Sequence, residues 1–181
     1  MKQYSSADLE ELLRRADARL SEPEVVVLVG GAVVGLVHGS SHATKDLDYV
    51  DGSSAALLAL AEVGAEMGIP IQNVAGIYCA PHDWEDRRTE FKLAGLSWLR
   101  VFVPEKHDFA MMKLARGTDH DIDAIVDIHS KAPFAFNVLC ARFRDTQVLG
   151  DGIDFKYAFA ATVERLFGIE AALAAVGEAE Q

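Results

Sequence analysis

The chain has 181 residues, half of them hydrophobic, which suits one domain, or one domain with a helical extension, around a sizeable core. The net charge of −11 argues against broad electrostatic binding to nucleic acid, because phosphate contacts need lysine and arginine, although it leaves room for a local basic patch. Cys79 and Cys140 have neither metal-ligand spacing nor a disulfide framework, so we expect small core residues in a reducing compartment.

The N-terminal segment predicts an amphipathic helix with Ser5 or Ser6 as its N-cap. Its apolar stripe consists of Leu9, Leu12, Leu13 and Leu20. No apolar signal-peptide core follows Met1, and the longest uncharged run, residues 25–41, is short for a membrane span and interrupted by glycines. We therefore expect a cytoplasmic protein with no membrane partner.

Residues 25–50 are the part of the chain around which the rest is organised. Residues 25–29 are apolar, four of the five are β-branched, and they predict a buried strand that ends at Gly30 and Gly31. A short apolar helix is expected over residues 32–37. The next strand carries Asp46 and Asp48, whose side chains should point to the same face because strand side chains alternate.

Two carboxylates on one face repel each other unless a cation lies between them. Mg²⁺ accepts one or two protein carboxylates together with substrate phosphate oxygens. The glycine pair precedes a helix, whose N-terminal N–H groups suit an anion, and glycine lets a phosphate approach the backbone closely. Together these features predict a site for a nucleoside triphosphate and Mg²⁺.

Residues 28–50 resemble the signature of the polymerase-β-type nucleotidyltransferase superfamily: an apolar residue, a Gly-Gly pair, a spacer and Asp-apolar-Asp. Here the spacer between Gly31 and Asp46 has 14 residues, slightly more than is usual. Residues 39–48 are more narrowly similar to small bacterial nucleotidyltransferase-like proteins of unknown function, relatives of AbiEii-type toxins and minimal nucleotidyltransferases. That group often has arginine in place of His42. The resemblance covers roughly residues 20–130.

Farther along, a helix capped by Ser53 is predicted to about residue 67. Residues 71–80 predict either one interrupted strand or a strand and a turn, and a charged loop around Trp84 follows. In that loop, Arg87 or Arg88 either reaches phosphate or belongs to a solvated turn. Strands follow at residues 89–93 and 99–103. The superfamily often has a third carboxylate on a later strand, as general base or further metal ligand, and Glu90 is the best candidate by position.

A helix over residues 106–114 resembles the superfamily's second block, in which a helix carries lysine and arginine. Lys113 and Arg116 are three residues apart and share a helix face, so they either bind triphosphate oxygens or pair with Asp119 and Asp121. Thr118 fits a capping box with Asp121 at the start of the next helix.

The expected fold is α/β, a nucleotidyltransferase-like small mixed sheet flanked by helices, with a C-terminal helical extension. We place the α/β domain at residues 1–131 and the extension, packed on it, at residues 132–181.

The resemblance implies that the chain transfers a nucleoside monophosphate from a nucleoside triphosphate to a hydroxyl acceptor. Two Mg²⁺ ions would be held by Asp46 and Asp48, and phosphates by Gly30 and Gly31. Further contacts to the nucleotide are expected from Thr44, Lys45, Lys113 and Arg116. The acceptor is open: an RNA end, a protein side chain or a small alcohol.

Some relatives are toxins paired with antitoxins, which implies a toxin–antitoxin role and an antitoxin-like protein partner. One alternative is a catalytically degenerate nucleotide-binding or protein-interaction module of the same fold. Another is an adaptor in which the aspartate pair only caps a surface turn.

Overall fold

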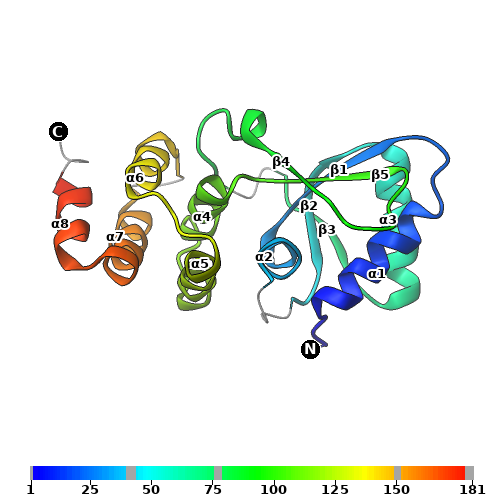
Figure 1. Ribbon diagram of the computed structural model, residues 1–181, viewed down its shortest axis with the longest axis horizontal. Coiled ribbons are helices and arrows are strands. Elements are labelled where there is room, and N and C mark those ends of the chain that lie inside the picture. Colours follow the sequence, from blue (N-terminus) through cyan, green and yellow to red (C-terminus); the bar gives the residue numbers. More distant parts are fainter. Residues whose placement is uncertain (1, 40–43, 76–78, 149–151, 178–181) are drawn as a thin grey trace. The chain divides into compact units, whose positions relative to one another are not determined.

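The computed structural model describes residues 2–39, 44–75, 79–148 and 152–177, and they form two compact units (Figure 1). Residues 1–75 and 88–104 make up the first, here called the sheet unit. The second, the helical unit, comprises residues 76–87 and 105–181. The predicted boundary between residues 131 and 132 falls inside the helical unit and stays a prediction.

The sheet unit is built on the small mixed sheet that the sequence predicted, and this sheet has five strands in the described residues. Its strand order is β3 (Ile71–Asn73), β2 (Leu47–Gly52), β1 (Glu24–Val29), β5 (Leu99–Val103) and β4 (Thr89–Phe91). The central strand β1 runs antiparallel to β2 and parallel to β5. The outer strands β3 and β4 are short, three residues each, which limits unpaired sheet edges.

Three helices pack together and against this sheet: α1 (Ser6–Asp17), α2 (Gly30–His38) and α3 (Ser54–Met67) (Figure 1). Ser5 caps α1 through a capping box with Asp8. Three of the predicted stripe leucines, Leu9, Leu12 and Leu13, are buried, whereas Leu20 lies beyond the helix and is half-buried. Leu28 and Leu47, from adjacent strands, are fully buried in the same core.

A buried carboxylate ties α1 to the start of β5. Asp17, at the last residue of α1, accepts hydrogen bonds from the backbone N–H groups of Ser97, Trp98 and Leu99, at distances from 2.6 to 3.1 Å. Three converging donors satisfy a buried charge, so Asp17 fixes where β5 enters the sheet.

In its described residues the helical unit contains a 3-10 turn, η1 (Trp84–Arg87), and five helices. These are α4 (Lys106–Leu114), α5 (Asp119–Lys131), α6 (Phe136–Asp145), α7 (Ile153–Phe167) and α8 (Ile169–Gly177). Phe109, Ile125 and Phe159 are fully buried in its core. The predicted C-terminal helical region is confirmed. None of the helices in the described ranges has the length and apolar character needed to cross a membrane.

Candidate functional site

The turn between β1 and α2 brings Asp48 against the glycine pair. β2 pairs with β1 so that Asp48 lies opposite Val29, one residue before Gly30. A Cβ atom on Gly30 would lie 2.1 Å from Oδ2 of Asp48, and the φ angle of Gly30 is +71°. Both facts require glycine at this position, and they place the Asp48 carboxylate directly against the turn.

Thr44 and Asp46 complete this arrangement. A Cβ atom on Gly31 would lie 2.7 Å from Oγ1 of Thr44. The Thr44 hydroxyl donates to the carbonyl oxygen of Asp46 at 3.1 Å and lies 3.4 Å from Oδ1 of the same residue. Gly30, Gly31, Thr44, Asp46 and Asp48 therefore gather at one place, here called the glycine–aspartate site.

Two other residues were predicted near this turn, Lys45 and His42. Lys45 is exposed beside Thr44, and its predicted contact with the nucleotide stays a prediction. His42, the departure from the similar proteins, lies outside the described residues. α2 begins at Gly30, and the side chain of its N-cap residue, Val29, makes no capping hydrogen bond, so the N-terminus of α2 lies beside the Asp48 carboxylate.

The donor set of the site suits a hard cation. It consists of oxygen atoms: two carboxylates and one hydroxyl. Mg²⁺ takes such ligands and completes its octahedron with water and substrate phosphate oxygens, so a site with only two protein carboxylates is sufficient. Within the described ranges, no group of three or more His, Cys, Asp or Glu side chains is placed to hold a metal.

Glu90 does not join the two aspartates. It lies on β4, and β1 and β5 separate that strand from β2, which corresponds to about 14 Å at normal strand spacing. Its carboxylate pairs with Arg100 at 3.0 Å and Lys92 at 2.5 Å, and the hydrogen bond from Arg100, then that from Lys92, lowers its pKa to about 2. Pairing of β5 between β1 and β4 thus separates Glu90 from the two aspartates, and its role as general base or further metal ligand stays a prediction.

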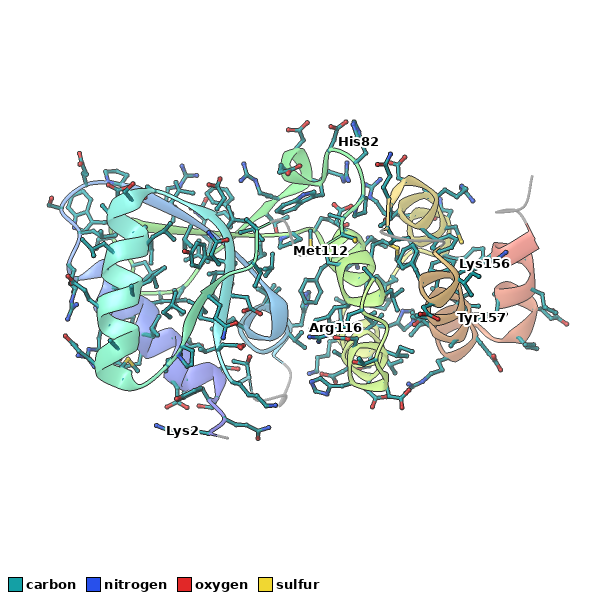
Figure 2. The ribbon with its side chains drawn as sticks, turned by 180° about the vertical axis from the view of Figure 1, so that it is seen from behind. Lys2, His82, Met112, Arg116, Lys156 and Tyr157 are labelled. Atoms are coloured by element: carbon teal, nitrogen blue, oxygen red, sulfur yellow. The ribbon has the colours of Figure 1, made fainter. Side chains whose placement is uncertain are left out.

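Lys113 and Arg116 lie in the helical unit, where both contact Asp121 (Figure 2 labels Arg116). Arg116 donates through Nε and Nη2 at 2.7 and 2.5 Å, and Nζ of Lys113 lies 3.3 Å away. Burial raises the pKa of Asp121, but hydrogen bonds from Arg116 and Thr118 and the charge of Lys113 outweigh it and hold the pKa at about 2. The pairing alternative is thus seen for Asp121, and contact with phosphate stays a prediction.

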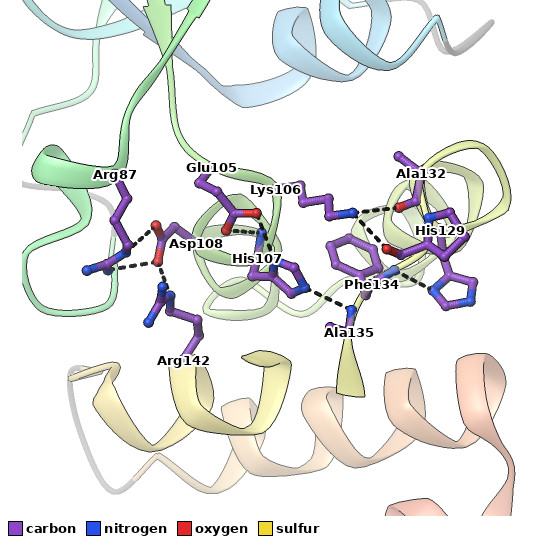
Figure 3. Close-up of polar contacts among 11 residues, drawn as sticks. Arg87, Glu105, Lys106, His107, Asp108, His129, Ala132, Phe134, Ala135 and Arg142 are labelled. Atoms are coloured by element: carbon purple, nitrogen blue, oxygen red, sulfur yellow. Dashed lines mark hydrogen bonds and ion pairs between the residues drawn. The ribbon is translucent and has the colours of Figure 1, made fainter. Parts of the chain in front are cut away.

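The sequence did not point to a second buried carboxylate in the helical unit (Figure 3). Asp108 is fully buried and accepts two hydrogen bonds of 2.9 Å from Arg87. Nε of Arg142 lies 2.9 Å from Oδ1 of Asp108 as an ion pair, although it is not aligned as a hydrogen bond. Arg87, one of two arginines considered for phosphate, therefore joins η1 to α4. Its hydrogen bonds to Asp108 raise its pKa.

A buried histidine lies beside this cluster. Nδ1 of His107 lies 2.8 Å from Glu105, and Nε2 accepts from the backbone N–H of Ala135 at 3.0 Å. The acceptor role of Nε2 assigns the proton to Nδ1, which donates to Glu105. His107 thus links α4 to the start of α6 and is a structural residue of the helical unit (Figure 3).

The sequence predicted both aspartates on one strand, but β2 begins at Leu47, so only Asp48 lies on it and Asp46 directly precedes it. A glycine turn beside two aspartates at the start of the neighbouring antiparallel strand of a mixed sheet is typical of a nucleotidyltransferase-like α/β fold. The comparison with protein families agrees with this class. Residues 6–162 match the model of the family described as nucleotidyltransferase of unknown function (DUF6036), and the chain belongs to that family. The searches of curated proteins and of solved structures found no match to this chain.

Proposed function

We propose that the chain transfers a nucleoside monophosphate from a Mg²⁺-bound nucleoside triphosphate to a hydroxyl acceptor. The observation that carries the proposal is the placement of the Asp48 carboxylate against Gly30, with Asp46 tied to Thr44 beside Gly31. This gathers acidic ligands and a helix N-terminus at one point. Membership of a nucleotidyltransferase family supports the same chemistry.

Each residue of the site has a distinct task in this proposal. Backbone N–H groups at Gly30 and Gly31, at the start of α2, bind the phosphate oxygens. Asp46 and Asp48 would hold Mg²⁺, which when bound neutralises charge on the phosphates and makes the acceptor hydroxyl a better nucleophile. The absence of Cβ atoms on the two glycines makes room for the Asp48 carboxylate and the Thr44 hydroxyl beside this turn.

Electrostatics make the cation essential to this scheme. Two carboxylates beside a triphosphate would repel it, and the net charge of −11 adds to that repulsion at long range. Binding of the nucleotide should therefore depend steeply on Mg²⁺. Lys45, Lys113 and Arg116 remain proposed contacts to the phosphates.

The acceptor is proposed only by class. An RNA end, a protein side chain and a small alcohol each supply a hydroxyl group that could attack the α-phosphate and release pyrophosphate. A toxin–antitoxin role with an antitoxin-like partner belongs to the same proposal.

The test is nucleotide binding with and without Mg²⁺, followed by pyrophosphate release with candidate acceptors. ATP, GTP, CTP and UTP are titrated against the wild-type chain, Asp46→Asn and Asp48→Asn. Asp51→Asn is the matched control, because Asp51 is exposed on the same strand, β2. Mg²⁺-dependent binding that both site variants lose and the control keeps supports the proposal; binding that persists in Asp48→Asn contradicts it.

A second candidate is a nucleotide-binding or protein-interaction module that has lost turnover. The position of Glu90, three strands from Asp48, favours it, since no third carboxylate joins the aspartate pair among the described residues. Mg²⁺-dependent nucleotide binding without pyrophosphate release on any acceptor would select this function. An adaptor in which the aspartates only cap a turn would show no effect of Mg²⁺ and nucleotide on melting.

A further inference from the structure

The N-terminal segment pairs with the chain just before β2. The backbone N–H of Tyr4 donates to the carbonyl of Thr44 at 2.7 Å, and the N–H of Thr44 donates back to the carbonyl of Tyr4 at 3.1 Å. This reciprocal pair is an antiparallel bridge outside the five-stranded sheet. Tyr4 therefore fixes the backbone of a residue whose side chain lies in the glycine–aspartate site.

Tyr4 is itself firmly held. Its side chain is 5% exposed, and its hydroxyl donates to the carbonyl of Gly68, the residue that ends α3. Nζ of Lys2 lies 5.0 Å from the centre of the ring (Figure 2 labels Lys2). The turn after α3 also holds the start of β2, because the carbonyl of Pro70 accepts from the N–H of Leu47 at 2.9 Å.

The two aspartates are positioned in different ways. Asp48 lies within β2 and pairs with Val29, so the sheet fixes its backbone. Asp46 precedes β2, which begins at Leu47, and so lies outside the β1–β2 ladder. The side-chain contact that holds Asp46 comes from the hydroxyl of Thr44.

We propose that Tyr4 and Thr44 are positioning residues that hold Asp46 beside Asp48, so that both carboxylates face one divalent cation. The proposal rests on the proposed function of this site. Tyr4 acts through the backbone of Thr44, and Thr44 acts through its hydroxyl on Asp46. Neither residue needs to touch the nucleotide.

Preorganisation sets the size of the expected effect. Ordering one mobile side chain on binding weakens affinity by roughly 2- to 12-fold. A carboxylate freed from Thr44 must be ordered by the cation itself, against repulsion from its neighbour. We therefore expect loss of the Thr44 hydroxyl, or of the Tyr4 bridge, to raise the dissociation constant for a divalent ion about 3- to 10-fold.

The first experiment is a titration with Mn²⁺, followed by electron paramagnetic resonance of the free ion, on the full chain. Thr44→Val removes the hydroxyl and keeps the side-chain shape, whereas Thr44→Ser keeps the hydroxyl. Thr44→Val should raise the Mn²⁺ dissociation constant about 3- to 10-fold, and Thr44→Ser should recover most of the affinity. Equal affinity of wild type and Thr44→Val overturns the proposal.

The second experiment tests whether Tyr4 acts through Thr44. Tyr4→Ala should weaken Mn²⁺ binding about as much as Thr44→Val, and the double variant should be no weaker than either single one, because both changes release the same carboxylate. If the losses of Mn²⁺ affinity add up in the double variant, Tyr4 does not act through Thr44 and the proposal is overturned. Hydrogen exchange should show lost protection at the Thr44 amide in Tyr4→Ala, while the Leu47 amide remains protected.

Failure of the proposed function looks different from failure of this inference. If the wild type binds Mn²⁺ no better than the Asp46→Asn and Asp48→Asn variants, both fall. If those two variants lose Mn²⁺ binding while Thr44→Val and Tyr4→Ala retain it, the metal site stands and only the positioning role is overturned. Thermal melting of each variant without metal verifies that it folds.

Discussion

Aspartates occupy two contrasting settings in this molecule. In the helical unit, Asp108 and Asp121 are completely buried, with 0% exposure. Each of them pairs with two cationic side chains. In the sheet unit, Asp46 and Asp48 are half-buried and lie against a hydroxyl group and a glycine backbone.

The difference separates carboxylates that stabilise from carboxylates that bind. Removing a buried carboxylate from between two cationic side chains leaves their positive charges uncompensated, and this is strongly destabilising. Two carboxylates held near each other at a turn instead repel, and a bound cation offsets that repulsion. Substitutions in the helical unit should therefore lower stability more than ligand binding. Substitutions of Asp46 or Asp48 should lower ligand binding more than stability.

The largest effect on stability is expected for Asp108→Ala. It leaves the guanidinium groups of Arg87 and Arg142 without their shared carboxylate, and breaking a buried pair costs about 3–5 kcal/mol. The free energy of unfolding, measured in urea, should fall by this amount. Asp86→Ala, at an exposed position in η1, is the control and should change it by less than about 0.5 kcal/mol.

A loss no larger in Asp108→Ala than in Asp86→Ala would show that the cluster contributes nothing to folding. Such a result would erase the contrast between the two settings. Any nucleotide binding by Asp108→Ala should be unchanged under conditions in which the variant remains folded.

The next largest effect is expected for Gly30→Ala. The positive φ angle costs on the order of 1–3 kcal/mol for alanine, and the new methyl group must also displace the Asp48 carboxylate. Gly39→Ala is the matched control: its φ angle is +60°, but nothing lies within 4 Å of a Cβ atom there. Melting should show a larger loss for Gly30→Ala, and only this variant should lose stabilisation by Mg²⁺ and nucleotide.

If both glycine variants keep that stabilisation equally, the close approach of Asp48 to Gly30 has no functional meaning. The backbone penalty is shared by the two positions, so the difference between them isolates the contact with the carboxylate.

Local signals predicted the part of the fold that carries the site. The β-branched run before Gly30, the glycine pair and the Asp-x-Asp spacing lie within one short segment, so the first strand and its turn follow from neighbouring residues. The start of β2 at Leu47, which leaves Asp46 outside the strand, did not. The capping box of Thr118 with Asp121 was predicted for the same reason and is confirmed.

The rest depends on pairing between residues far apart in the chain. The distance of Glu90 from the aspartates follows from strand order, because β5 pairs between β1 and β4. The bridge from Tyr4 to Thr44 and the contact of Arg142 with Asp108 likewise join segments at least 34 residues apart. No periodicity or capping pattern encodes such contacts, which is why Tyr4 and Asp108 were missed.

A smaller effect, visible only in acid, is expected from Asp121. Its folded-state pKa of about 2 lies below the ordinary aspartate pKa of 3.8, so the carboxylate contributes stability above the unfolded-state pKa and loses it as the pH falls toward 2. The contribution is roughly 2 kcal/mol. The free energy of unfolding of wild type, measured in urea, should decrease as the pH falls from about 5 to about 2. That of Asp121→Asn should depend less on pH. Parallel profiles would contradict the assignment.

The smallest effect on stability is expected for Asp46→Asn, and it should have the opposite sign. Asparagine keeps an Oδ1 acceptor for the Thr44 hydroxyl while removing one of two neighbouring negative charges, so the free energy of unfolding without metal should stay level or rise by up to about 0.5 kcal/mol. Stabilisation by Mg²⁺ and nucleotide should nevertheless disappear. Asp51→Asn, exposed on β2, should retain it. A clear loss of metal-free stability in Asp46→Asn would place this aspartate with Asp108 and Asp121, among the carboxylates that hold the fold together.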